Sequence, residues 1–528
     1  MKARDSARDP TPTHRHSRIA RGVELACVAA LLSGLWPAAM AADSRLVDAV
    51  KQGDTPAIRA LLKQKVDVNA ARADGQTALQ IAAFRGDQEV VDLLLRAGAN
   101  PNAANVLGAT PLWAAATNSS TAIVEALLKA GANPNVASNS GETSLIAAAR
   151  VGSVPIVRAL VKAGADPTAR EGFRDQTALM FAIPAHHPDV VRLLIEVGAD
   201  IHTPSKTWHE HGLACCQDYN NDSGRPMDVV QGGFTPLLYA VQSGDLESAK
   251  LLLAAGANVN DRAANGVSAI AMAAIMGRRD LLRLLVDRGA DVDAADGGYT
   301  ALLASVLRQD YDAAKLLLMH GANPNAILTK PSPTRASGFA EYTFHYRWLG
   351  ATAFYIAAMF YDVDMMRMLA AHGADPSAGK QDGSTPLMAA AGTPKPVDWQ
   401  RDSRTPIDQD GVVAVAPPDP KEEEGRLEAV RFVVGLGVDV NAINHGGETA
   451  LHRASAKRYL TMVQFLVDNK ANVNAKTRNG LTPLSIAMTE RPLPGGGGDI
   501  RYMRRARDRV DAPREKLTEL LRQRGARE

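Results

Sequence analysis

The sequence predicts an all-α solenoid, a linear stack of similar helix pairs, and three observations support this prediction. A short motif at Thr77–Leu79 recurs in register at segments that start at Thr110, Thr143, Thr177, Thr235, Ser268, Thr300, Thr352, Thr385, Thr449 and Thr482. Most copies are 32–34 residues apart, a period typical of solenoid proteins. The chain is 46% hydrophobic but only 5% aromatic, which favours closely packed helices.

Each copy predicts the same order of elements. Thr77 suits the N-cap of a first helix, because its hydroxyl can accept from backbone N–H groups two or three residues on. Small residues follow at Ile81–Ala83, and Gly86–Asp87 interrupts the helix. A second helix follows over residues 90–95, with apolar side chains spaced for one face. Gly98 is expected to end it in a left-handed conformation.

These residues resemble the ankyrin repeat. Its first helix opens with Thr-Pro-Leu-His, and Thr110–Leu112 and Leu451–His452 each match part of that motif. Its second helix ends in Gly-Ala, matched here at residues 98, 131, 164, 198, 256, 289, 321 and 373. The resemblance implies a curved stack of helix–turn–helix units with a projecting hairpin, here called a finger, between consecutive units. With an atypical unit at 43–70, we count twelve units in one array over residues 42–525.

Four insertions interrupt the period, and insertions into repeats map to surface loops. Residues 202–232 and 327–349 lie between consecutive units, on the finger edge. Residues 393–424 and 491–512 lie between the two helices of one unit, on the opposite edge.

The first 41 residues predict a signal peptide. Arg15, Arg18 and Arg21 precede an apolar run from Val23 to Trp36, and Ala39–Ala41 fits a cleavage site. The run is about 14 residues, which is short for a membrane span. We expect a bacterial protein exported to the periplasm or outside the cell, cleaved near Ala41, with no stable membrane span after signal removal.

The charge of the chain argues against a nucleic-acid partner. Residues 1–41 carry six of the 59 basic and three of the 57 acidic residues. The remainder therefore has 53 basic and 54 acidic residues, a net charge of −1. Because a basic surface is the electrostatic requirement for nucleic-acid binding, we expect protein partners instead, and a monomer.

The first insertion contains the only cluster with potential chemistry, at His209, His211, Cys215 and Cys216. His and Cys are zinc ligands, but adjacent cysteines do not readily occupy two tetrahedral positions. A disulfide between Cys215 and Cys216 is a second alternative in an oxidising compartment, and free thiols are a third. The sequence contains no nucleophile elbow, phosphate loop or Cys-x-x-Cys pair. We therefore expect no enzymatic activity, no cofactor and no metal.

The second insertion is rich in aromatic residues. In ten positions it carries Phe339, Tyr342, Phe344, Tyr346 and Trp348. Two alternatives stay open: these rings fold back on the array as a small hairpin, or they form an exposed anchor for a partner, since Trp and Tyr dominate interface hot spots. Trp208 gives the first insertion an aromatic residue as well.

We predict a non-enzymatic protein-interaction scaffold that uses its concave face and finger edge. The ankyrin resemblance implies groove contacts from the starts of the first helices, at Gln80, Trp113, Ile146, Leu238 and Tyr355. Trp113 is the strongest single candidate. Two alternatives are a redox- or metal-handling accessory protein that uses the His209–Cys216 segment, and a secreted effector that binds host proteins.

Overall fold

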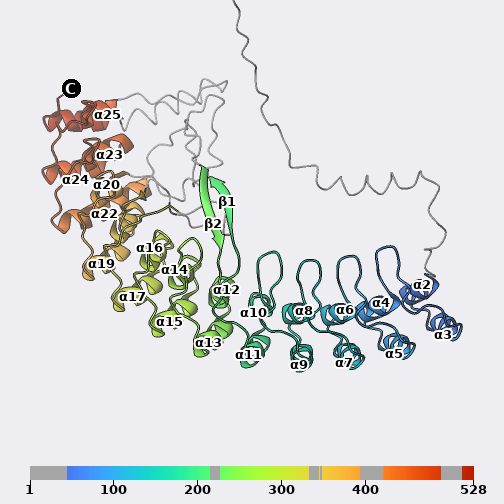
Figure 1. Cartoon of the computed structure of the whole chain (residues 1–528). Helices are drawn as coiled ribbons and strands as arrows, with labels where there is room; N and C mark the ends of the chain where they lie inside the picture. Colours follow the sequence, from blue (N-terminus) through green and yellow to red (C-terminus); the bar gives the residue numbers. More distant parts are fainter. Residues whose placement is uncertain are drawn as a thin grey trace, which may run out of the picture.

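The computed structural model describes residues 44–213, 226–331, 344, 348–392, 420–488 and 514–527. Over these residues the chain forms twelve antiparallel helix pairs stacked in sequence order, which confirms the predicted solenoid. Figure 1 shows that the stack curves, with the first helices and the fingers on the concave side and the second helices on the convex side.

The first helices of the units are α2 (Arg45–Gln52), α4 (Ala78–Arg85), α6 (Pro111–Thr117), α8 (Ser144–Val151), α10 (Ala178–Ala182), α12 (Pro236–Ser243), α14 (Ala269–Ile275), α16 (Ala301–Leu307), α18 (Ala353–Met359), α20 (Pro386–Gly392), α23 (Ala450–Lys457) and α25 (Pro483–Met488). The second helices are α3 (Thr55–Lys63), α5 (Gln88–Arg96), α7 (Thr121–Lys129), α9 (Val154–Lys162), α11 (Pro188–Glu196), α13 (Leu246–Ala254), α15 (Arg279–Asp287), α17 (Tyr311–Met319), α19 (Val363–Ala371), α22 (Pro420–Gly435), α24 (Leu460–Asp468) and a helix over 514–523.

Local hydrogen bonds fix where the helices begin and end. The Thr77 hydroxyl accepts from the backbone N–H of Gln80 at 3.3 Å, as an N-cap should. Gly86 has φ of 73°, so it ends α4 in the left-handed conformation that glycine adopts without strain. Asp87 then caps α5 by accepting from the N–H of Val90 at 3.1 Å. The N-cap of α4, the turn that ends it and the N-cap of α5 therefore follow directly from the residue types.

The core runs the length of the stack between the two rows of helices. Alanines such as Ala82 and Ala83 are fully buried where neighbouring first helices approach. The fingers are joined by a side-chain ladder in which Asn69 accepts from the N–H of Asn100 and Asn102 accepts from that of Asn133, both at 2.7 Å. These bonds hold successive fingers in a fixed relation.

The first insertion extends one finger into a two-stranded antiparallel sheet. Strand β1 (Thr207–Leu213) pairs with β2 (Pro226–Gly232), from Thr207 opposite Gly232 to Leu213 opposite Pro226. Figure 1 shows this hairpin rising from the concave side. The Arg174 guanidinium lies 5.0 Å from the centre of the Trp208 ring, so the base of the hairpin contacts the preceding finger.

Two aromatic residues of the second insertion fold back on the array. Phe344 is fully buried, with its ring centre 4.8 Å from that of Tyr299, and Trp348 is 8% exposed. The back-folding alternative is therefore confirmed for Phe344 and Trp348, and their prediction as exposed anchors is wrong. Tyr342 and Tyr346 lie outside the described residues.

The third insertion is shorter than predicted. Helix α22 begins at Pro420, so residues 420–424 belong to a helix and not to the insertion. The reason is Arg426, a fully buried residue that donates to the Glu422 carboxylate at 2.7 Å and to the Ala390 carbonyl at 3.1 Å. The Ala390 carbonyl belongs to the last turn of α20. After this helix, the insertion replaces the short connection that joins the two helices in other units.

The remaining predicted segments lie largely outside the described residues. These are the signal peptide at 1–41, most of 393–424, and the insertion at 491–512. Within the part of the chain that the structure describes, no helix combines the length and hydropathy that crossing a membrane requires.

Candidate protein-binding surface

A groove lies on the concave side of the second to fourth units. Its volume is about 770 Å³. Helices α4 and α6 form its floor, and the fingers at 105–109 and 138–142 form its walls. We call this the N-terminal groove.

The floor and one wall of the N-terminal groove are apolar. Ile81 and Trp113 are half-buried on the floor, whereas Phe84 on α4 is 59% exposed and Leu107 at a finger tip is 66% exposed. Exposed apolar side chains that gather in one place are typical of interaction sites. The surface therefore has the chemistry of a protein-binding groove.

Hydrogen bonds hold the walls of the N-terminal groove in place. The Asn139 side chain donates to the Val106 carbonyl at 2.8 Å, and the Asn139 backbone N–H donates to the Leu107 carbonyl at 2.9 Å. Glu142 forms an ion pair with Arg150 at 2.7 Å. Because the walls are fixed before binding, a partner loses less free energy in ordering them.

The predicted groove residues divide into two groups. Gln80 and Trp113 line the N-terminal groove. Ile146, Leu238 and Tyr355 are fully buried in the core, so the prediction that they contact a partner from the groove is wrong. All five occupy the third position after the N-cap residue. At Ile146, Leu238 and Tyr355 this position is closed to solvent, whereas Trp113 is half-buried.

His452 shows the structural role of the third position after the N-cap residue. Its Nδ1 lies 2.9 Å from the Thr449 hydroxyl and its Nε2 lies 3.2 Å from the carbonyl of Leu481, in the next finger. Gln80 makes the equivalent bond, donating from Nε2 to the Ala109 carbonyl at 2.9 Å. The third position therefore links one unit to the next, through a hydrogen bond or, at Ile146 and Leu238, through packing.

Two further residues of the N-terminal groove on α4 were not predicted from the sequence. Ile81 is one position beyond Gln80, and Phe84 is three positions further along the same helix. The position of Ile81 does not face solvent in every unit, because Ala114 and Ala147, at the same position of the next two units, are buried. Helix periodicity alone therefore does not identify these groove residues.

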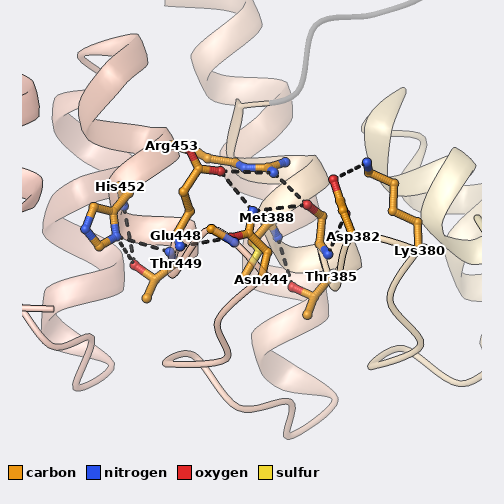
Figure 2. Close-up of polar contacts among 11 residues, drawn as sticks. Lys380, Asp382, Thr385, Met388, Asn444, Glu448, Thr449, His452 and Arg453 are labelled. Carbon is orange, nitrogen blue, oxygen red and sulfur yellow. Dashed lines mark hydrogen bonds and ion pairs between the residues drawn. The ribbon is translucent and has the colours of Figure 1, made fainter. Parts of the chain in front are cut away.

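The equivalent surface of the tenth to twelfth units is polar. Arg453, on α23, stands four positions after Thr449, as Ile81 does after Thr77. It donates to the Ser384 hydroxyl at 2.7 Å and lies 3.4 Å from the Glu448 carboxylate. Figure 2 shows Arg453 and Glu448 close to Asn444, whose amide donates to Glu448 at 2.9 Å. We call this surface the C-terminal polar surface.

The protonation states of His452 and Asp382, at the C-terminal polar surface, follow from burial and hydrogen bonds. Burial lowers the pKa of His452, which favours the neutral imidazole. Burial alone raises the pKa of Asp382, but hydrogen bonds from Lys380 and Ser384 outweigh it and lower the value. These groups stabilise the fingers around Arg453.

The predicted metal and thiol site is only partly described. His209 and His211 lie on β1, and Cys215 and Cys216 fall in the undescribed residues 214–225. Among the residues that the structure describes, no three His, Cys, Asp or Glu side chains come together to hold a metal ion.

Comparisons with known proteins agree with this architecture. A family model described as ankyrin repeats (3 copies) matches residues 46–138, 130–205 and 237–327, and one described as ankyrin repeats (many copies) matches 433–487. Together these ranges cover more than half of the chain.

Among the relatives, the B-cell lymphoma 3 protein homolog of Mus musculus is 28% identical over 222 residues, 41% of this chain and 40% of that protein. A putative ankyrin repeat-containing protein of Treponema pallidum is 44% identical over 126 residues, 23% of this chain and 41% of that protein. The chain thus spans less than half the length of either relative. The repeated helix pairs, their capping residues and the matched family models show that the chain belongs to the ankyrin repeat family.

Proposed function

We propose that the protein is an interaction scaffold that binds a partner protein in the N-terminal groove. It acts by binding and not by catalysis. The family supports a role in protein–protein interaction, because ankyrin repeats are interaction modules. The observation that carries the choice of surface is the exposure of Phe84 and Leu107 beside the half-buried Ile81 and Trp113.

The energetics favour this surface. Full burial of a Leu or Phe side chain contributes about 1.5–3 kcal/mol. Since Phe84 and Leu107 are each more than half exposed, a partner that covers both gains at least about 1.4 kcal/mol, a tenfold change in affinity. The walls are already ordered, so little of this gain is lost.

Affinity capture of the tagged chain from its source cells tests the proposal. We expect the Phe84→Ser/Leu107→Ser double variant to recover at least tenfold less partner than the natural chain. Met319→Ser is the matched control, because Met319 is 67% exposed at the end of α17, on the convex side. Equal recovery by the double variant and the control would exclude the N-terminal groove as the binding surface.

We further propose that the scaffold acts in the periplasm or outside the cell. The arginines at 15, 18 and 21, the apolar run at 23–36 and the small residues at 39–41 support export. Cell fractionation with N-terminal sequencing tests this, and a mature N-terminus near Ala42 outside the cytoplasm is expected. An intact N-terminus in the cytoplasmic fraction contradicts export. It leaves the proposal that the N-terminal groove binds a partner unchanged.

A further inference from the structure

The ladder of hydrogen bonds between the fingers is interrupted on both sides of the fifth unit. The twelve units have eleven junctions, and at eight of them an Asn or Asp side chain accepts from a backbone N–H of the next finger at 2.7–2.8 Å. Asn135 and Asn260 are the accepting residues on either side of the interruption. Within the residues that the structure describes, the fifth unit has no ladder bond to the fourth unit or to the sixth.

The residue types at the ladder position explain the interruption. Thr168 in the fourth unit and His202 in the fifth stand where the regular units have Asn or Asp. The Thr168 hydroxyl donates instead to the Asp166 carboxylate of its own finger, at 2.7 Å. His202 interacts with Asp261 of the sixth unit through charge, and over the described ranges it makes no hydrogen bond to that unit. The base of the fifth finger is therefore not bonded into the ladder.

The backbone bonds that remain at these two junctions lie nearer the tips of the fingers. The N–H of Lys206 donates to the Arg174 carbonyl at 2.8 Å, and the N–H of Ala264 donates to the Gly232 carbonyl at 3.1 Å. Bonds at both the base and the tip of a finger fix the angle between two units. A bond at the tip alone leaves rotation about that point.

Two side-chain contacts also cross these junctions. Arg170 donates to the Pro204 carbonyl at 3.1 Å, and Gln176 donates to the Tyr239 hydroxyl at 2.6 Å. Both donors are long side chains with several rotatable bonds, and such side chains have many rotamers. These contacts can follow a rotation of the units that the short Asn bridge of a regular junction would resist.

The helices of the fifth unit also offer less packing surface. Helix α10 has five residues and is the shortest first helix in the described part of the chain. Pro184 follows it closely, and proline has no N–H with which to continue a helix. In Figure 1 the second helices from α3 to α11 form a nearly straight row, and those from α13 to α19 rise away from it. The stack therefore changes direction at this unit.

The junction between the ninth and tenth units also lacks a ladder bond among the described residues, but other bonds replace it. The Ser377 hydroxyl donates to Asp375 of its own finger at 2.6 Å. Asn444 and Arg453, from later in the chain, donate to the Ser384 hydroxyl at 3.4 and 2.7 Å. These bonds tie the ninth finger to the units that follow it, so the double interruption at the fifth unit is the weaker place.

We propose that the fifth unit is a hinge, about which units one to four and units six to nine rotate as two rigid blocks. The N-terminal groove lies wholly in the first block and moves without changing shape. The curvature of the concave face changes at the hinge, and the β1–β2 hairpin, part of the fifth finger, moves with it. This inference goes beyond the proposed function and does not depend on it.

Distances between pairs of spin labels test the hinge. The labels replace Arg158, Lys250 and Lys315, each the exposed fifth residue of its second helix. The pair Arg158→Cys/Lys250→Cys spans both interrupted junctions, and Lys250→Cys/Lys315→Cys spans two bonded ones. Since packed helices are about 8–10 Å apart, labels two units apart are separated by roughly 20 Å. Both pairs are placed in the full chain with its three natural cysteines replaced by serine.

We expect a broader distance distribution for the first pair than for the second. Thr168→Asn/His202→Asn restores the ladder residue at both junctions, and it should narrow the first distribution to the width of the second. In the same variant, exchange of the Asp200 and Asn258 amide hydrogens should slow about three- to tenfold, the effect of one hydrogen bond. The distribution for Lys250→Cys/Lys315→Cys should not change.

The reciprocal variant Asn260→Thr removes a ladder bond from a regular junction. It should broaden the distribution of the pair Lys250→Cys/Lys315→Cys, and the unfolding midpoint of each variant checks that the array is intact. Equal widths for the two pairs in the otherwise natural chain overturn the hinge. So does a first distribution that stays broad in Thr168→Asn/His202→Asn together with no broadening in Asn260→Thr. Neither result affects the binding of a partner in the N-terminal groove.

Discussion

The N-terminal groove and the C-terminal polar surface occupy equivalent places on the same scaffold and have opposite chemistry. Four positions after the capping threonine, the second unit has Ile81 and the eleventh has Arg453. Ile81 lies beside exposed apolar side chains, whereas Arg453 is bonded to Ser384 and lies beside Glu448. Where this position reaches the surface, as in these two units, its residue type matches the chemistry around it, apolar at Ile81 and charged at Arg453.

The two regions also differ in how they are stabilised. The second to fourth units are regular, with buried alanine and leucine between the helices. The tenth unit is interrupted, and its helices are joined through the buried Arg426. Four substitutions test this comparison, in order of decreasing expected effect.

Arg426→Ala should have the largest effect on stability. It removes the ion pair with Glu422 and the hydrogen bond to the Ala390 carbonyl, and each lost hydrogen bond from a charged group costs about 1.5–3 kcal/mol. Urea unfolding monitored by hydrogen exchange should show the C-terminal units opening first, with the second to fourth units unchanged. Arg431→Ala, an exposed position on the same helix, is the control and should cost less than about 1 kcal/mol.

Ile146→Ala tests the reassignment of the third position from binding to packing. Removing a fully buried isoleucine side chain should cost about 2–5 kcal/mol of unfolding free energy. Partner affinity, measured below the unfolding transition, should stay within twofold of the natural value. Reduced affinity with unchanged stability would instead restore Ile146 as a binding residue.

Acidification should weaken the eleventh unit more than the second. The pKa of His452 is lowered in the folded state, so below about pH 6.5, the ordinary histidine value, the unfolded chain binds more protons at this site. Stability from His452 is therefore complete above that pH and falls as the pH decreases, by at most about 1.4 kcal/mol per pH unit. Gln80, at the equivalent position, does not titrate.

Hydrogen exchange of α23 and α4 at pH 7.5 and pH 5.5 measures this difference. His452→Gln should remove the part of the pH dependence in α23 that exceeds the dependence in α4. If the variant keeps the full pH dependence, other groups must cause it and the buried histidine contributes nothing measurable.

Arg453→Met should have the smallest effect. It removes the hydrogen bond to Ser384 and the contact with Glu448, while Asn444 still bonds to Glu448. The loss of one partly buried hydrogen bond costs about 1 kcal/mol. Partner binding in the N-terminal groove should not change. A large loss of binding would show that the partner also reaches the C-terminal polar surface.

The repeat architecture could be predicted because its determinants are local. Thr77, Gly86 and Asp87 act within a few residues of their own positions, so their spacing in the sequence reveals the caps and turns. The number of units and the finger-edge position of the first insertion followed from the same period. The start of α22 was missed, because it depends on a long-range bond from Arg426 to Ala390.

The groove was predicted at the right surface, but only some of the predicted residues lie in it. Gln80 and Trp113 do line it, whereas Ile146, Leu238 and Tyr355 do not. Which of two consecutive helix positions faces solvent depends on how neighbouring units rotate against each other, and a single sequence does not encode that rotation locally. The exposure of Leu107 likewise depends on the relative placement of two fingers.

The most direct test of the central claim is hydrogen exchange of the chain with and without its captured partner. We predict protection at residues 76–84, 105–114 and 138–142, the segments that contribute to the N-terminal groove. We predict no change at 380–384 and 444–453. Protection confined to the C-terminal segments, with the N-terminal groove unaffected, would contradict the assignment of the binding surface.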